Sequence, residues 1–441
     1  MTAEVPTGRE PERTDDALHA PTARDRLQRR TVRVLVASQV LGGVGVGSGV
    51  AVVGLLAFEL SGTASLSGVS ATASTLGAAG AALVIARIAV ARGRRPSLVT
   101  GYLVGAAGAA LAVVAAVLGL FWLHVVASAA FGWASASNLQ ARYAATDLAR
   151  PERRARSLSS IVWATTIGAV AGPNLTGPGE AVSGLLGLPP LAGAYLFSLA
   201  SFAGAAAVQA VLLRPDPLRV VADAAADNRG DQAAVPAVAM TGWAALRAAA
   251  HTIRAVPETL VAVLAITAAH AVMVGIMVMT PVHMEDNGAA LQLVGITISL
   301  HIAGMYALSP VMGALADRFG RRNVVLFGLV QLAVAAVLAA TGDPTGSVWF
   351  QGGLVLLGTG WSACLIAGSA WLTDAVHTAD RPAVQGASDL AMNLAGGVGG
   401  TLAGVVLAVA GYPALSFGAL LLLVPAAVGA VRLGRAGSTR R

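Results

Sequence analysis

Twelve long apolar segments joined by short polar loops constrain this chain more than any other feature. A helix needs roughly 20 apolar residues to cross the hydrocarbon core of a bilayer. Hydrocarbon offers no partner for a free backbone N–H or C=O group, so each segment is expected to be an α-helix. The segments lie near 32–58, 64–90, 97–120, 122–146, 157–179, 190–213, 257–282, 290–316, 323–340, 348–372, 386–410 and 414–433. The sequence therefore predicts an all-α integral membrane protein with 12 transmembrane helices.

Composition excludes most other classes of protein. Of the 441 residues, 56% are hydrophobic and 12% are charged, whereas a soluble domain carries about 25% charged residues. A soluble enzyme, a disordered chain and a nucleic-acid-binding protein are therefore excluded. The chain contains no lysine, hence no Walker-type Gly-Lys sequence, and it has no nucleophile elbow; we expect no enzyme activity and no cofactor. Cys364 is the single cysteine, so no internal disulfide can form.

Arginine placement predicts the orientation in the membrane. Arginine-bearing loops such as 91–96, 150–156 and 318–322 alternate with arginine-free loops such as 177–189 and 341–346. By the positive-inside rule, the arginine-bearing loops and both termini are cytoplasmic. All 29 basic residues are arginine, which indicates a GC-rich bacterial genome. We expect a multi-pass protein of the cytoplasmic (plasma) membrane.

The two halves of the chain repeat each other at an offset of 227 residues. Gly93-Arg94-Arg95 recurs as Gly320-Arg321-Arg322, and Thr146-Asp147 recurs as Thr373-Asp374. A constant offset predicts a duplicated six-helix unit, and such halves enclose a substrate site near the membrane midplane. The predicted organisation is a disordered cytosolic tail (1–31), an N-terminal bundle (32–213), a cytosolic linker (214–256), a C-terminal bundle (257–434) and a second tail (435–441). The second part of the linker is predicted to be either an interfacial amphipathic helix or a solvated connector.

A motif after span 8 identifies the family that the chain resembles. The segment 313–322 reads Gly-Ala-Leu-Ala-Asp-Arg-Phe-Gly-Arg-Arg, and it resembles the cytoplasmic signature of the major facilitator superfamily. The resemblance covers residues 32 to 434 and implies an alternating-access transporter, which in that family is expected to be a monomer. A carboxylate near a helix end, facing arginines, forms a latch that can break and re-form. The predicted gating residues are Gly313, Asp317, Arg318, Gly320, Arg321 and Arg322. The first copy of the motif has Val90 and Ala91 where the second has Asp317 and Arg318.

Span 5 carries the pattern Gly168-x3-Gly172-Pro173-x3-Gly177. It resembles part of the glycine-proline signature of drug/proton antiporters in the same superfamily, although Ser159 replaces the upstream glycine. Glycines let helices approach closely, so a helix-packing surface is the simpler interpretation. The antiporter interpretation remains open.

Methionine and histidine residues gather in spans 7 and 8. Met273-x3-Met277 lies in span 7 and His301-x3-Met305 in span 8, and residues four apart share one helix face. Both pairs lie near mid-membrane by the helical rise of 1.5 Å per residue. Thioether and imidazole groups suit Cu(I). The pattern resembles the CcoA-like copper importers of the superfamily, which implies a metal site formed by Met273, Met277, His301 and Met305.

Three functions stay open from the sequence. The first is transport of a small solute, with copper as the named substrate and His270, Met273, Met277, His301 and Met305 as the site. The second is efflux of a drug or metabolite by a proton-coupled antiporter, in which the methionines line an adaptable cavity. The third is a membrane sensor or assembly factor, against which the latch argues. No acidic residue lies in the middle of a span, so His270 or His301 is the expected proton carrier if protons drive transport.

Overall fold

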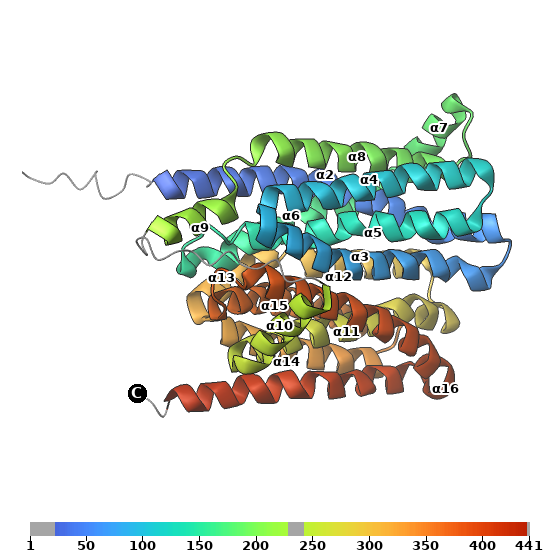
Figure 1. Cartoon of the computed structure of the whole chain (residues 1–441). Helices are drawn as coiled ribbons and strands as arrows, with labels where there is room; N and C mark the ends of the chain where they lie inside the picture. The colour runs from blue at the N-terminus through green and yellow to red at the C-terminus, as the bar shows by residue number, and fades with distance from the viewer. Residues whose placement is uncertain (1–22, 228–241, 439–441) are drawn as a thin grey trace, which may run out of the picture.

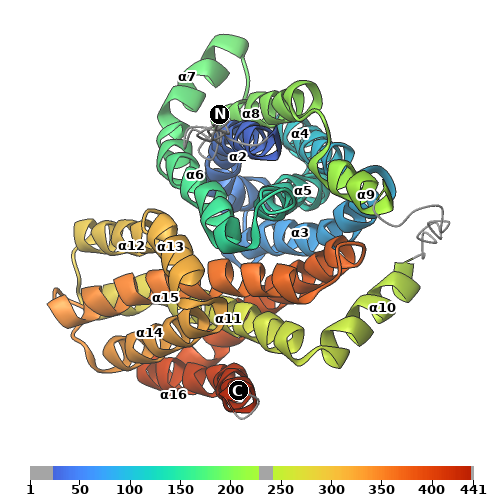
Figure 2. The same ribbon diagram turned by 90° about the vertical axis from the view of Figure 1, so that its left-hand side faces the viewer.

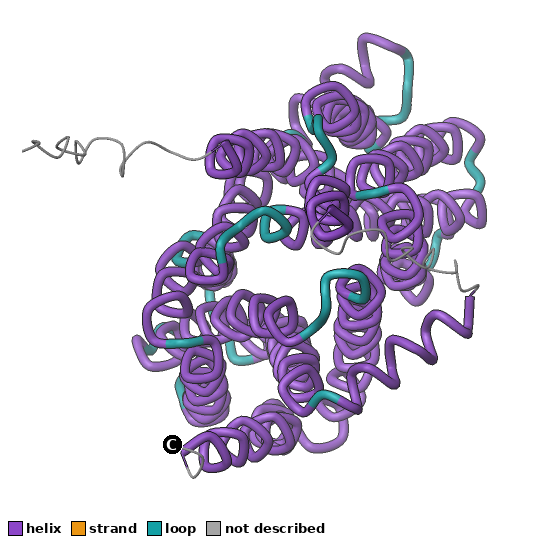
Figure 3. Tube along the Cα trace, turned by 60° about the vertical axis from the view of Figure 1, so that its left-hand side comes forward, coloured by secondary structure: helices purple, strands orange, loops and turns teal. Residues whose placement is uncertain are grey.

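The computed structural model describes residues 23–227 and 242–438, and all regular elements in this part of the chain are helices (Figures 1 and 3). The N-terminal half contains α2 (Ala23–Ser61), α3 (Ala64–Arg92), α4 (Arg94–Leu118), α5 (Phe121–Ala144), the short 3-10 turn η1 (Pro151–Arg153), α6 (Arg154–Asn174), α7 (Thr176–Leu186) and α8 (Ala192–Leu212). The linker contains α9 (Pro217–Asp227) and α10 (Gly242–Ala255). The C-terminal half contains α11 (Pro257–Asp286), α12 (Leu291–Tyr306), α13 (Ser309–Phe319), α14 (Arg321–Thr341), α15 (Val348–Ala375) and α16 (Arg381–Ser438).

These helices accommodate the twelve expected spans. Nine of the described helices are long and apolar enough to cross a membrane. One of them, α16, holds two spans, because Gly411 (φ 80°) breaks it. With α5 and α6, the described helices provide all twelve spans. Span 8 consists of α12 and α13, which are separated at 307–308, just before Pro310 at the start of α13. The prediction of an all-α fold with two six-helix halves is confirmed.

Each half has its own hydrophobic core. Figures 1 and 2 show α2–α8 and α11–α16 as two bundles that meet along one face, with both ends of the described chain on the same side. The core of the first bundle includes Phe131, Tyr195 and Phe202, and that of the second includes Phe350 and Trp361. Many large apolar side chains point away from both cores, among them Leu103, Val330 and Leu421. This arrangement suits helices whose outer surface faces lipid.

Tryptophans mark one edge of this outer surface. Trp122 and Trp349 lie at the starts of α5 and α15 and are 69% and 72% exposed. They are separated by the 227-residue offset, so the repeat places the same aromatic group at the same level of both halves. Exposed indole rings at the ends of spans are typical of the boundary between lipid and water. This edge is opposite the arginine-bearing loops.

The first helix begins earlier than the sequence indicates. The segment 1–31 is predicted to be a disordered tail, but α2 begins at Ala23, and residues 1–22 lie outside the described part. Contacts with the loop after α5 hold this extension: Arg24 Nε donates to Leu148 O at 3.1 Å and Gln28 Nε2 donates to Ala145 O at 2.7 Å. The extension thus covers the cytoplasmic end of the first bundle.

The linker forms two helices on either side of residues 228–241, which lie outside the described part. Ala249 and Ile253 of α10 are buried against Leu372, Val376 and Val384 of the second bundle. The helix α10 is amphipathic: one face is apolar and the other faces carry arginines. The apolar face therefore packs on the second bundle. The second tail, 435–441, is helical as far as Ser438, and residues 439–441 are outside the described part.

Candidate functional site: a central cavity above a closed cytoplasmic gate

A cavity of about 320 Å³ lies between the two bundles. Seven helices contribute its wall: α2, α5 and α6 from the first half and α11, α12, α15 and α16 from the second. The lining residues are Gln39, Val46, Ser135, Asn138, Leu139, Arg142, Ile161, Val162, Thr165, His270, Met273, Met305, Tyr306, Trp361, Leu365 and Met392. A site shared between two bundles is the arrangement that alternating access requires.

Aromatic rings form the side of the cavity contributed by the second half. The ring of Tyr306 meets the indole of Trp361 edge to face, with centroids 5.7 Å apart and an interplanar angle of 84°. Trp361 Nε1 donates to His270 Nδ1 at 3.0 Å. This bond requires an acceptor at Nδ1, so it holds His270 as a neutral imidazole with its hydrogen on Nε2. The hydrogen bond fixes the orientation of both rings.

Neutral hydrogen-bonding groups line much of the side contributed by the first half, and Arg142 of α5 is the charged residue among them. Gln39 Nε2 donates to Thr165 Oγ1 at 2.9 Å, and Asn138 accepts from the Tyr102 hydroxyl. The Gln39 Oε1 atom is buried without a partner among the described groups. An unpartnered buried acceptor is costly, so it is available to a solute that donates a hydrogen bond. The cavity therefore combines an aromatic wall with a polar wall.

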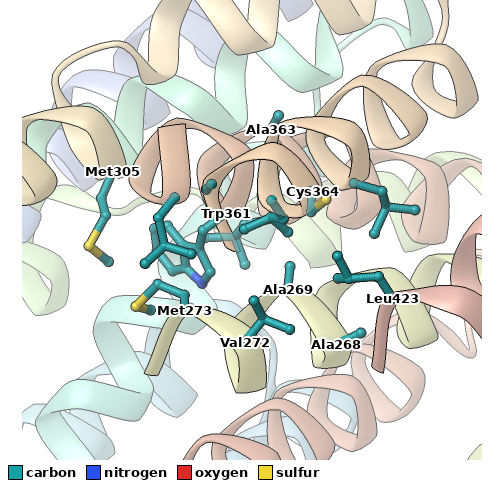
Figure 4. Close-up of a cluster of buried hydrophobic side chains, with 14 of the residues drawn as sticks. Ala268, Ala269, Val272, Met273, Met305, Trp361, Ala363, Cys364 and Leu423 are labelled. Atoms are coloured by element: carbon teal, nitrogen blue, oxygen red, sulfur yellow. The ribbon is translucent and has the colours of Figure 1, made fainter. Parts of the chain in front are cut away.

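The structure separates the four residues that the sequence assigns to a metal. Met273 and Met305 line the cavity together with His270, and Figure 4 shows both methionines on the same side of the cluster as Trp361. Met277 instead packs against the core of the second half. His301 is 1% exposed, and its Nδ1 lies 2.8 Å from Leu354 O, which ties α12 to α15. Neither Met277 nor His301 lines the cavity.

Below the cavity, an ion pair joins the two halves. Arg142 of α5 binds the Asp389 carboxylate of α16, and Gln140 Nε2 donates to the other carboxylate oxygen at 2.9 Å. The side chains of Arg142 and Asp389 are each 1% exposed. Arg142 Nε also donates to Ser369 Oγ at 3.3 Å. Arg142 and Ser369 are 227 residues apart, so two equivalent positions of the repeat touch where the halves meet. Arg142 and Asp389 both lie near the ends of their apolar segments, and nothing in the sequence pairs them.

A second buried pair lies within the first half. Arg94 Nε donates to Asp147 Oδ2 at 2.8 Å and Arg94 Nη2 donates to Oδ1 at 3.2 Å. Arg94 Nη2 also donates to Gln385 of the other half at 2.7 Å. The repeat places an equivalent pair in the second half, where Arg321 Nε donates to Asp374 Oδ2 at 3.1 Å. The 227-residue offset of the sequence is thus visible as a repeated ion pair.

The motif after span 8 contacts the other half. Asp317 accepts from the backbone N–H groups of Ala155 at 3.2 Å and Arg156 at 2.9 Å, at the first turn of α6. Arg321 binds Asp317 within the motif and donates to Pro151 O across the interface. These contacts place a carboxylate at a helix N-terminus, where the helix dipole favours it.

The other motif residues have separate roles. A Cβ added at Gly313 would lie 2.3 Å from Ser159 Oγ, so glycine there allows α13 to approach α6. Gly320 has φ 88°, which turns the chain between α13 and α14. Arg322 Nε donates to Ala430 O at 2.6 Å, whereas Arg318 is exposed. In the described part of the chain, the hydrogen bonds between the halves lie at or below the cavity, so the cytoplasmic side is closed.

The first copy of the motif makes no equivalent contact, since Val90 and Ala91 carry no carboxylate. These two residues line a second cavity of about 690 Å³, between α3, α10 and the start of α16. The loss of the acidic side chain thus coincides with a hollow that the linker helix α10 covers.

The glycines of span 5 pack against the first helix. A Cβ added at Gly168 would lie 2.2 Å from the Gly43 carbonyl carbon, and one at Gly172 would lie 2.5 Å from Gly47 Cα. A Cβ at Gly177 would meet nothing within 4 Å. Pro173 lies in the last turn of α6, which ends at Asn174. Two of the three glycines therefore serve the close contact of α6 with α2.

Comparisons with known proteins agree with this architecture. The sequence model of the Major Facilitator Superfamily matches residues 35–286 and 261–440. The chain is 36% identical over 421 residues to "Uncharacterized MFS-type transporter YddS" of Bacillus subtilis (strain 168), covering 93% of each chain. It is 28% identical over 379 residues to "Riboflavin transporter RfnT" of Brucella anthropi, covering 82% of this chain and 85% of the relative. The crystal structure of the human organic anion transporter MFSD10 (TETRAN) has a similar fold, with a TM-score of 0.71 at 16% identity, over 91% of this chain and 99% of that one.

Proposed function

Because this chain belongs to the Major Facilitator Superfamily and is a membrane transporter, we propose that its central cavity carries a planar, aromatic organic solute. The single observation that carries this proposal is the pairing of the two cavity walls. Trp361 and Tyr306 offer aromatic surface, and Gln39, Asn138 and Thr165 offer hydrogen bonds to the polar edge of a ring. A mostly apolar pocket with a few placed polar groups is typical of small-molecule sites.

A flavin is the solute to test first. Its ring system has a flat face for stacking on Trp361 and an edge with donors and acceptors. The relative named as a riboflavin transporter supports this choice, since it covers 82% of this chain. We further propose that the transporter is a monomer in the cytoplasmic membrane of a bacterium. A relative of 36% identity in Bacillus subtilis supports the bacterial origin.

The test is riboflavin uptake by a riboflavin-auxotrophic bacterium that expresses the wild type, Trp361→Ala or Trp349→Ala. Stacking of a base on an aromatic side chain contributes about 1–3 kcal/mol, so Trp361→Ala should weaken uptake by about tenfold or more. Trp349→Ala removes the same side chain from the lipid-facing edge, where it is 72% exposed, and should leave uptake unchanged. Failure of the wild type to support riboflavin-dependent growth would refute the flavin as substrate.

Copper uptake is a second candidate, favoured by one observation: the thioethers of Met273 and Met305 share the wall of the cavity. Thioethers are soft, uncharged ligands that suit Cu(I). Accumulation of radioactive copper would be compared in the wild type, Met273→Leu and Met305→Leu, with Met277→Leu and His301→Ala as variants outside the cavity. Equal accumulation in all five strains would eliminate this candidate.

Efflux of a drug or metabolite by a proton antiporter uses the same cavity in the opposite direction. The glycine-proline pattern of α6 is the feature that favours it. Extrusion of a fluorescent dye would be measured before and after collapse of the proton gradient. Extrusion that continues after the collapse would contradict an antiporter.

A further inference from the structure

We propose that Asp389 is the proton-binding site that couples the central cavity to the cytoplasmic gate. This inference goes beyond the proposed substrate and does not depend on it. Asp147 and Asp389 are the most deeply buried acidic residues in the described part of the chain, each with its side chain 1% exposed. Their partners distinguish their roles.

The Asp147 carboxylate is held by its own half. Both of its oxygens accept from one guanidinium, that of Arg94, which lies in the same bundle. When the halves move apart, this ion pair travels as a unit and no buried charge loses its partner. Asp147 therefore serves as a structural anion, whether the gate is open or closed.

The Asp389 carboxylate is held by the opposite half. One of its oxygens accepts from Arg142 and the other from Gln140 Nε2, and both donors belong to α5. Opening of the cytoplasmic gate withdraws both donors at once. An ionised carboxylate left without a partner at a buried position is strongly unfavourable. Protonation removes this obstacle, because a neutral carboxyl group needs no cation beside it.

The cavity gives protons a path to this carboxylate. Arg142 and Met392 both line the cavity, and Met392 lies about one helical turn from Asp389 on α16. A proton that arrives through cavity water would add to a carboxylate oxygen and release the guanidinium. Arg142 keeps hydrogen bonds to Leu139 O and Tyr143 Oη within its own half, so it stays solvated by the protein when the pair breaks. No other reactant is needed, since one proton is bound and no covalent bond changes.

Three other charged or titratable groups surround this pair: Arg94, Tyr143 and His270. Arg94 of α4 exerts a Coulombic attraction on its carboxylate, in addition to that of Arg142. Tyr143 of α5 interacts with both members of the pair. His270 of α11 experiences the charge of Arg142, and it is held neutral by the bond from Trp361 described above. Asp389 is thus the group here whose charge change alters contacts between the halves.

The experiment needs no solute, which separates it from the test of the proposed function. Spin labels on Arg33→Cys of α2 and Arg432→Cys of α16 report the separation of the cytoplasmic ends by pulsed electron paramagnetic resonance. Both arginines are exposed, and the native Cys364 is buried and will not take a label. The double-cysteine protein is placed in lipid nanodiscs and measured across a pH series. Acidification is expected to move the distance distribution toward the longer, open form.

Three variants on this labelled background decide the outcome. Asp389→Asn should show the open distribution at every pH. Asp343→Asn, the same change at an exposed loop carboxylate, should titrate as the unmodified protein does. If Asp389→Asn fails to fold, Gln140→Leu decides: loss of one hydrogen bond to the carboxylate should move the midpoint to higher pH by about one unit. A wild-type titration in Asp389→Asn, or an unmoved midpoint in Gln140→Leu, would overturn the proposal.

Discussion

Replacement of Asp317 by Asn should release the cytoplasmic latch. In the closed form the carboxylate accepts from the N–H groups of Ala155 and Arg156 at the first turn of α6. Its side chain is 5% exposed, so water screens these contacts weakly. Asn keeps one acceptor oxygen but loses the negative charge that the helix N-terminus and Arg321 stabilise. The perturbation is therefore electrostatic and nearly isosteric.

The magnitude follows from the contacts that are lost. Hydrogen bonds to a charged group contribute about 1.5–3 kcal/mol, against about 0.5–1.5 kcal/mol for neutral ones. The helix dipole adds about 0.3–1 kcal/mol. A loss of about 2 kcal/mol changes the equilibrium between closed and open forms roughly 30-fold. If the closed form holds about 99% of molecules, the open fraction should rise to about a quarter.

The assay is the distance between spin labels on Arg33→Cys and Arg432→Cys, at a pH where the unmodified latch is closed. Asp343→Asn is the matched control, since it removes an exposed carboxylate on the opposite side of the membrane. Val90→Asp supplies the carboxylate that the first copy lacks and should shift the equilibrium toward the closed form. An Asp317→Asn distribution indistinguishable from that of the control would show that the latch does not hold the gate.

Further predictions concern packing, a buried charge and the cavity. Gly172→Ala should lower stability by about 1–3 kcal/mol, because its Cβ would meet the backbone of α2, whereas Gly177→Ala should have little effect; thermal unfolding in detergent compares the two. Arg94→Ala leaves the Asp147 carboxylate buried without its cation and should lower the free energy of unfolding by about 3–5 kcal/mol. The neighbouring Arg95→Ala should lower it by under about 1 kcal/mol. Equal unfolding midpoints for the two variants would contradict this prediction. Trp361→Phe keeps an aromatic face but removes the hydrogen bond to His270. Riboflavin binding, measured by equilibrium dialysis, should weaken by about fivefold. An unchanged affinity would show that the indole N–H is dispensable.

Much of the fold can be predicted from the sequence because the bilayer imposes a length and a polarity on each helix. The twelve apolar segments correspond to helices whose ends differ by only a few residues in most cases. The departures come from particular contacts and residues. The start of α2 at Ala23 depends on hydrogen bonds to a loop more than a hundred residues away, and the division of span 8 accompanies Pro310 at the start of α13. Neither feature changes the periodic spacing of apolar residues that predicts the helices.

The candidate site was only partly predictable. Helical spacing places Met273 and Met277 on one face, but that face is wide enough for one to line the cavity and the other to pack in the core. Met392 also lines the cavity, and no cluster in the sequence marks it. The pairing of Arg142 with Asp389 spans 247 positions of the chain, so it becomes visible only when the two bundles are assembled.

The contact between Arg142 and Ser369 bears on how such a protein could arise. In a symmetric dimer of one six-helix unit, the residue on the twofold axis faces its own copy. If both copies had arginine at this position, the two guanidinium groups would repel each other. If both had serine, the carboxylate of α16 would have no cation beside it. Fusion of the two units into one chain removes this restriction, because each position can then mutate alone. A lone charge pair at the centre is therefore a property that a single chain permits and a symmetric dimer of identical units does not.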